Sequence, residues 1–297
     1  RKAAMAMSAA RNNIKKRYRF FDKGLHETAA DRMRIEEGLV IAIRDSHFEL
    51  HYQPVYKLDS KDIHHYEALI RWNHPTEGLL YPDRFIGIAE QSGQIQEIGY
   101  WVIREACNLI KDHLFHLAMC PRVAVNLSPK QLMDPGLVES IQQIIRDVGI
   151  DAHYLEIEIT ESTVMENLDE AIGTLHRLKK MGITISIDDF GTGYSSLAVL
   201  RRLPADKLKI DRSFISNISI DRNDQRIVRG IIFMAHSLKM QVVAEGIETE
   251  QQESTLLRYS CDFGQGYLFS KPIPMSATEH ENVLDVNATS VELSEVQ

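Results

Sequence analysis

Short apolar runs alternate with longer amphipathic segments along most of the chain. Residues 29–45 place apolar side chains among charges at roughly helical spacing, which predicts an amphipathic helix. Beyond it lie about eight short runs typical of strands, with helical patterns between most of them. In order, these runs are residues 48–56, 65–72, 122–128, 154–160, 182–189, 206–211, 240–246 and, weakest of all, 261–266.

This alternation predicts an α/β fold. Strands separated by helices form right-handed crossovers and a parallel sheet, and a number near eight favours a closed TIM-like (β/α)8 barrel. An open doubly wound sheet is the alternative. Residues 57–62 are too few for a helical crossover, so the first strand should run antiparallel to the second.

Several of the predicted strands end on a polar side chain that faces the barrel interior. Side chains on a strand alternate between its two faces, so Leu155, Ile157 and Ile159 face the helices, and Glu156 and Glu158 face inward. Parallel strands of a barrel end at one mouth, where enzymes of this architecture place their chemistry. The same sorting brings five strand ends together there, namely Asn126, Glu158, Asp188, Lys209 and Glu245.

Further polar residues extend this ring. The second run adds Glu67, Leu69 and Arg71 on one face, and Gln265 closes the ring. Carboxylate and amide oxygens without histidine or thiolate suit Mg²⁺ or Mn²⁺, and so many acids indicate two ions, bridged by Asp188 or Asp189. The oxygen donors are then Glu67, Asn126, Glu158, Asp188, Asp189 and Glu245.

Buried ion pairs at strand ends are the competing interpretation. Lys209 facing Asp188 fits it well. Ion pairing does not account for the whole ring, because two cations, Lys209 and Arg71, cannot balance so many acids. The unpaired carboxylates would be costly to bury without a metal ion. The glycine-rich residues 191–197 can form a strand-to-helix turn and a lid over the site at once.

Charge and composition exclude several classes of function. Residues 1–21 hold seven of the 34 Lys and Arg and no acid, so the remainder carries 27 basic against 42 acidic residues. Such a surface repels a phosphate backbone, and we expect no DNA binding. Three widely spaced cysteines argue against disulfides and zinc, and no apolar run reaches membrane-spanning length. We expect a cytoplasmic location, either alone or as the cytosolic part of a larger membrane-anchored protein.

Eight motifs in order resemble the EAL family of cyclic di-GMP phosphodiesterases, from about Phe48 to Pro274. They are YQPV at 52–55, EALIR at 67–71, NLS at 126–128, EITE at 158–161, DDFGTGYSSL at 188–197, KID at 209–211, EGIE at 245–248 and QGYLFSKP at 265–272. The resemblance implies a barrel with an antiparallel first strand and two Mg²⁺ or Mn²⁺ ions. Ca²⁺, which is larger and less strict about octahedral geometry, should inhibit. His65 departs from the glycine that the family often has at this position.

The resemblance also implies roles for individual residues. The metal ligands would be Glu67, Asn126, Glu158, Asp188 and Glu245, with Asp189 completing the shell of the second ion. Lys209 would orient or activate the attacking water, and we assign catalysis to Lys209, Glu245, Glu67 and Asp211. The dinucleotide would contact Gln53, Leu69 and Arg71, with Gln265 on the side of the water; Glu161 would anchor the 188–197 loop, and Glu248 would support the site.

The resemblance divides the chain into three parts. Residues 1–28 are similar to the end of a GGDEF domain and its linker, residues 29–285 form the EAL domain, and 286–297 form a polar tail. The parent protein would be a GGDEF-EAL tandem. An EAL homodimer is expected, and no membrane contact within this chain.

Hydrolysis of cyclic di-GMP to linear pGpG is the function predicted, because every ligand position and the loop are intact. A receptor that binds the dinucleotide without cutting it is the alternative. A metal-dependent isomerase or aldolase, with Lys209 as a Schiff-base lysine, is a third possibility that the acidic ring fits poorly.

Overall fold

The computed structural model describes residues 23–114, 120–191 and 197–275. It contains two compact units. The first comprises the residues up to Glu49 together with Arg71–Glu97, and the second comprises Leu50–Ile70 and the residues from Ile98 onward. The expectations for residues 1–22 and 276–297 lie outside the described residues.

The first unit is built around helix α2 (Lys23–Arg44) and a short aromatic core. It also holds the start of β1 (Phe48–Lys57), the end of β2 (Ile63–His74), β3 (Gly78–Leu80), the 3-10 turn Pro82–Arg84 and α3 (Ile86–Ser92). The rings of Phe48 and Trp72 lie 6.0 Å apart, and a Cβ added at Gly38 would be 2.9 Å from the Trp72 ring. Glycine therefore allows α2 to pack closely on this core.

The helix predicted over residues 29–45 is confirmed, but not all of its apolar residues are buried. Ile35 and Leu39 are fully buried, whereas Met33 and Ile41 are 52% and 43% exposed. Residues two positions apart cannot share one face of a helix. The buried face instead consists of residues three or four positions apart, such as Ile35 and Leu39.

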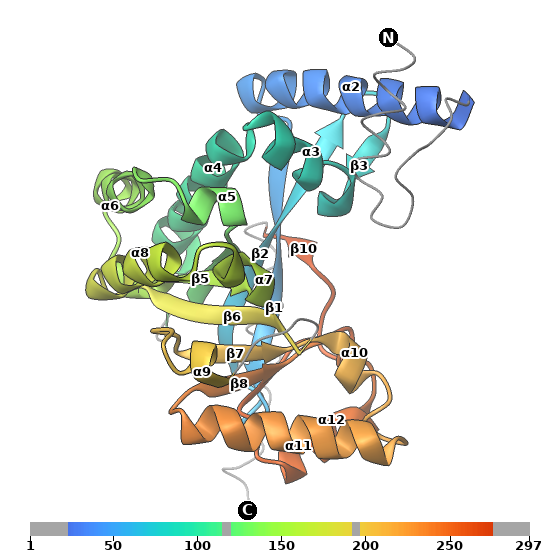
Figure 1. The fold of residues 1–297 in the computed structure, drawn as a ribbon, viewed down its shortest axis with the longest axis vertical. Coiled ribbons are helices and arrows are strands. Elements are labelled where there is room, and N and C mark those ends of the chain that lie inside the picture. Colours follow the sequence, from blue (N-terminus) through green and yellow to red (C-terminus); the bar gives the residue numbers. More distant parts are fainter. Residues whose placement is uncertain (1–22, 115–119, 192–196, 276–297) are drawn as a thin grey trace, which may run out of the picture. The chain divides into compact units, whose positions relative to one another are not determined.

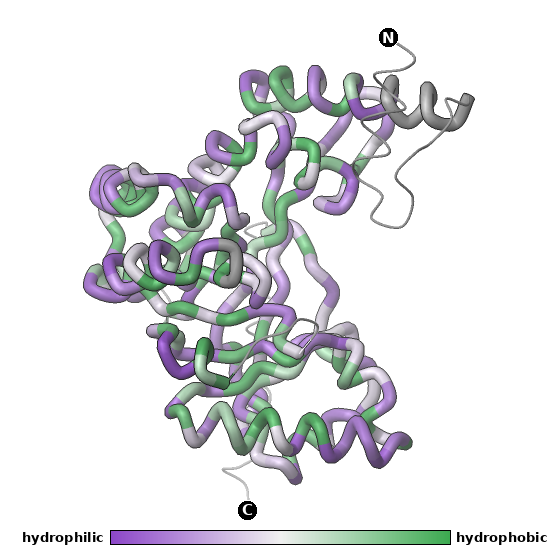
Figure 2. Tube along the Cα trace, viewed as in Figure 1, coloured by the Kyte–Doolittle hydropathy of each residue, from purple (hydrophilic) through white to green (hydrophobic). Residues whose placement is uncertain are grey.

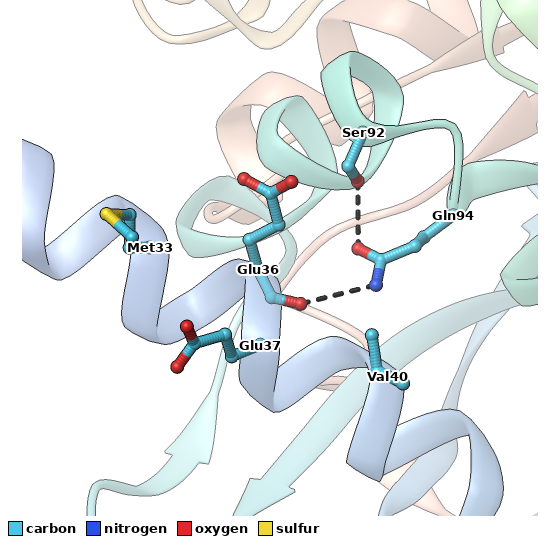
Figure 3. A pocket seen from close by; sticks show the side chains of 6 residues that line it. All are labelled: Met33, Glu36, Glu37, Val40, Ser92 and Gln94. Carbon is cyan, nitrogen blue, oxygen red and sulfur yellow. Dashed lines mark hydrogen bonds between the residues drawn. The ribbon is translucent and has the colours of Figure 1, made fainter.

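A hollow of about 350 Å³ lies beside α2, where Gln94 Nε2 donates a hydrogen bond to the Glu36 carbonyl over 3.2 Å (Figure 3). Met33, Glu37, Val40 and Ser92 complete its lining. The lining includes no basic side chain or histidine, and the two carboxylates are not opposed by any cation there.

The second unit contains a closed barrel of eight strands (Figure 1). Beside β1 and β2 these are β4 (Arg122–Asn126), β5 (Leu155–Thr160), β6 (Thr184–Phe190), β7 (Lys207–Ile210), β8 (Gln241–Ala244) and β9 (Phe263–Gly264). From β2 to β9 neighbouring strands are parallel, β9 pairs antiparallel with β1, and β1 pairs with β2 to close the ring. The predicted barrel with an antiparallel first strand is confirmed.

Helices follow the strands and cover the barrel from outside. They are α4 (Ile95–Leu109), which continues as a π-helical turn at Ile110–Leu114, α5 (Pro129–Leu132), α6 (Leu137–Val148), the 3-10 turn Ala152–Tyr154, α7 (Glu161–Glu166), α8 (Leu168–Lys180), α9 (Leu197–Leu200), α10 (Arg212–Ile215), α11 (Arg222–Ser237) and α12 (Glu250–Arg258). The outward residues Leu155, Ile157 and Ile159 of β5 are fully buried. Green and purple segments alternate along these helices in Figure 2, as amphipathic helices require.

Two short strands were not predicted from the sequence. β3 extends β2 through the pair Trp72 and Leu80, and β10 (Ile273–Pro274) pairs with β1 at His51. Segments of two or three residues carry too little apolar pattern to be recognised. Among the described residues, no helix is long and apolar enough to cross a membrane.

Candidate metal centre in the barrel

Lys209 lies at the centre of a ring of carboxylates inside the barrel. Its Nζ is 2.7 Å from Glu158 Oε2 and 2.7 Å from Glu245 Oε1. Glu67 and Asp188 follow at 3.3 and 3.4 Å. These side chains come from five different strands or strand ends, as the alternation of faces predicts, and one ammonium group is left to balance four acids.

Amide side chains complete one side of the ring. Asn126 Nδ2 donates to Glu67 Oε1 over 2.8 Å, and Gln265 Nε2 donates to Glu67 Oε2 over 2.7 Å. Gln265 Nε2 also reaches Gln53 Oε1 at 3.0 Å, and Gln53 Nε2 donates to the carbonyl of Ser270. Both oxygens of Glu67 are thus fixed, and Asn126 keeps its own amide oxygen available as a donor to a metal.

An unusual backbone conformation brings a second aspartate to the ring. Asp188 faces the interior, so strict alternation would turn Asp189 outward. Asp189 instead adopts a φ of 54°, in the left-handed region, and the register between β6 and β7 shifts between Ile187 and Phe190. As a result, one oxygen each of Asp188, Asp189 and Glu245 lie within 4.8 Å of one another. Aspartate tolerates the left-handed region better than most residues other than glycine, so this conformation turns Asp189 toward the ring at modest cost.

Burial and charge shift the ionisation of this ring. Burial raises the pKa of the Glu158 carboxyl well above its usual value, and neighbouring Glu67 adds to the effect. Burial likewise raises the pKa of Glu245 to about 8, although Lys209 opposes the shift. Burial also favours a neutral Lys209, but the surrounding carboxylates outweigh it and raise its pKa well above the usual value. Without a further cation the ring therefore retains protons that a metal ion would displace.

Two overlapping groups of ligands fit divalent ions. Glu67, Glu158 and Asp188 form one group and Asp188, Asp189 and Glu245 the other, so Asp188 belongs to both. Glu158 Oε1 is buried and has no hydrogen-bond partner, which leaves one carboxylate oxygen free to bind a cation. Oxygen donors alone suit hard ions such as Mg²⁺ and Mn²⁺.

A second polar layer lies two residues earlier on the same strands. Lys207 Nζ is 2.6 Å from Glu156 Oε2, and Ser186 Oγ donates to the same carboxylate. His65 is fully buried, with its Nδ1 3.4 Å from Lys207 Nζ. An ammonium can only donate, so this ring nitrogen accepts and His65 Nε2 carries the hydrogen. His65, Glu156 and Glu158 also cluster closely, but in this layer the ammonium of Lys207 already pairs with Glu156.

A pocket of about 300 Å³ opens onto the carboxylate ring. The predicted residues Gln53, Leu69, Glu248 and Gln265 line it together with Glu67, Asp188 and Glu245. Arg212, Ser216, Gly246, Gly266 and Tyr267 complete the lining. None of these five was assigned a role from the sequence, although Gly246, Gly266 and Tyr267 lie within the quoted EGIE and QGYLFSKP motifs and Arg212 directly follows the KID motif.

Three other predicted residues occupy different surroundings. Arg71 belongs to the first unit, where its guanidinium lies 4.8 Å from the Tyr81 ring centroid. Asp211 Oδ1 accepts a hydrogen bond from the Ser213 N–H over 3.1 Å and caps α10. Glu161 Oε2 accepts from the N–H of Gly191, where the 188–197 loop begins.

A closed α/β barrel with a ring of carboxylates around one lysine, able to hold divalent ions, defines the class of this protein. Residues 36–272 match the EAL domain family model, and the chain belongs to that family. The Pseudomonas aeruginosa protein named cyclic di-GMP phosphodiesterase NbdA is 47% identical over 274 residues, which cover 92% of this chain and 34% of NbdA. The chain thus spans about a third of that relative.

Two solved structures are similar over most of the chain. The PaMucR phosphodiesterase in complex with c-di-GMP gives a TM-score of 0.78 at 41% identity, covering 81% of this chain and 98% of that one. The EAL enzyme Bd1971, with cAMP and cyclic di-GMP bound, gives 0.80 at 34% identity, covering 96% and 74%.

Proposed function

We propose that this chain hydrolyses one phosphodiester bond of cyclic di-GMP, producing linear pGpG and lowering the level of this second messenger. The observation that carries the proposal is the pair of ligand groups that share Asp188 beside Lys209, at the base of an open pocket. NbdA is named as a cyclic di-GMP phosphodiesterase and the PaMucR phosphodiesterase structure is a complex with c-di-GMP, which supports the choice of reaction and ligand.

Glu67, Asn126, Glu158, Asp188, Asp189 and Glu245 would hold two Mg²⁺ or Mn²⁺ ions. When bound, such ions supply an activated water and neutralise charge on the phosphate. Ca²⁺, which is larger and less strict about octahedral geometry, should inhibit.

The side chains of the ring would orient the reactants. Lys209, held between Glu158 and Glu245, presents N–H groups that can fix the position of the attacking water or neutralise charge beside it. Gln53 and Gln265, joined to each other over 3.0 Å, offer amide groups at the pocket wall. We assign a catalytic contribution to Glu67, Glu245 and Asp211 and dinucleotide contacts to Leu69 and Arg71. Glu161 would anchor the loop that follows Asp189, and Glu248 would support the ring.

A receptor that binds the dinucleotide without cutting it is the second candidate. It is favoured by the raised pKa of Glu158 and Glu245, because protonated carboxyls hold metal poorly. The intact set of oxygen donors favours hydrolysis instead.

A direct assay decides between the two. The protein is incubated with cyclic di-GMP and Mg²⁺ or Mn²⁺, with and without chelator, and pGpG is measured by chromatography. Metal-dependent formation of pGpG supports the hydrolase, and tight binding without product supports the receptor. Asp188→Asn is the matched variant, since it preserves shape while removing the charge shared by both ligand groups, and it should abolish turnover.

We further propose an EAL homodimer and a parent protein of the GGDEF-EAL type, with residues 29–285 as its EAL domain. The length of NbdA relative to this chain is compatible with additional domains. A cytoplasmic location fits this function.

A further inference from the structure

Arg212 is the basic side chain in an otherwise acidic pocket wall. Glu67, Asp188, Glu245 and Glu248 line the same pocket, whose lining has no other lysine or arginine. Arg212 is exposed, and within the described ranges it has no ion-pair partner. Its guanidinium charge is therefore available to a ligand.

The backbone around Arg212 places it beside the metal ligands. Gly246 has a φ of +69°, and a Cβ added there would lie 2.5 Å from the Cβ of Arg212. The residue that follows Glu245 thus contacts the base of the Arg212 side chain directly. Asp211 fixes the first turn of α10 from the other side, and Ser216 lines the pocket one turn later.

The charge of the proposed ligand identifies what this arginine can bind. Cyclic di-GMP carries two phosphodiesters, and only one of them can occupy the metal centre at a time. The second phosphate carries the same negative charge and lies in the pocket, away from the carboxylate ring. Glu248, which also lines the pocket, would repel it. A guanidinium matches two phosphate oxygens with paired N–H donors.

The geometry points to Arg212 as the residue that binds the uncut phosphate and thereby orients the other phosphate on the metal centre. This inference rests on the proposed function. If Arg212 has this role, the protein should bind a ligand with two charged phosphates more tightly than a ligand with one.

The test is calorimetric binding in Ca²⁺, so that the ligand is not consumed. Two ligands are compared, cyclic di-GMP and an analogue in which one phosphodiester is replaced by an uncharged methylphosphonate. Wild type should bind the analogue about 10- to 100-fold more weakly, the range expected for loss of a charged hydrogen-bonded pair. Arg212→Ala should bind both ligands equally, and Arg212→Lys should regain part of the preference. Arg229→Ala, an exposed arginine of α11, removes the same charge outside the pocket and should bind as wild type does.

Retention of the wild-type preference by Arg212→Ala would overturn the inference, even if its affinity for both ligands falls, because the preference for two charged phosphates would then not depend on Arg212. Failure of wild type to bind cyclic di-GMP at all would instead contradict the proposed function.

Discussion

Lys209 Nζ lies 2.7 Å from one oxygen of Glu158, while the other oxygen of that carboxylate is buried without a hydrogen-bond partner. The lysine thus satisfies only half of Glu158. A buried acceptor left unpaired is costly, and the cost is removed if a metal ion occupies that position. The free oxygen of Glu158 points to a ring assembled around bound cations rather than around Lys209 alone.

Removal of the central lysine should destabilise the metal-free protein. Lys209→Met leaves several buried acids without their cation, and breaking such a buried pair costs about 3 to 5 kcal/mol. The free energy of unfolding, measured by urea denaturation in chelator, should fall by that order. Saturating Mn²⁺ should restore part of it. An unchanged midpoint in chelator would mean that Lys209 does not balance the ring.

Asp189 should tolerate asparagine better than a β-branched residue. Its φ of 54° suits Asp and Asn, whereas valine would be strained by roughly 1 to 3 kcal/mol. Asp189→Asn should therefore keep its thermal stability but bind the second metal ion more weakly, and Asp189→Val should lose both. Equal stability of the two variants would show that the left-handed backbone is not required.

Stability without metal should fall as pH rises. The folded-state pKa of Glu245 is about 8, above its ordinary 4.5, so between these values the unfolded state gives up the proton first. The favourable contribution is fully present below about pH 4.5 and is lost as pH approaches 8. Glu158, whose pKa is also raised, acts in the same direction.

Metal binding should reverse this dependence, because it requires the ionised carboxylates. Melting temperatures measured in chelator and in Mg²⁺ from pH 5.5 to 8.5 should diverge, with the largest stabilisation by Mg²⁺ at high pH. Glu245→Gln, which cannot ionise, should flatten the curve in chelator. If the stabilisation by Mg²⁺ is constant from pH 5.5 to 8.5, the raised pKa of Glu245 is contradicted.

The second layer should behave as a closed pair that needs no metal. Lys207→Met leaves Glu156 buried and unpaired, at a cost of about 3 to 5 kcal/mol, and the double variant with Glu156→Gln should recover much of it. Chemical denaturation of the two single variants and the double variant measures this coupling. Strict additivity would exclude a direct interaction.

The sequence predicted the barrel and the ring because both follow from strand alternation. Glu67, Glu158 and Asp188 point inward from β2, β5 and β6, and the structure brings one carboxylate oxygen of each within 4.8 Å of the others. Strand alternation alone would turn Asp189 away from the ring, and its observed position depends on a left-handed φ and a register shift that the sequence pattern does not reveal. Arg212 was missed because it lies on a helix of four residues. Such a helix is too short for the spacing of its apolar residues to show which side faces the pocket.

Anomalous diffraction from crystals grown with Mn²⁺ tests the central claim most directly. Two Mn²⁺ ions about 4 Å apart should appear on either side of Asp188, with Glu158 Oε1 bound to one of them. A ring that remains closed around Lys209, with no ion or with ions outside these carboxylates, would contradict the account.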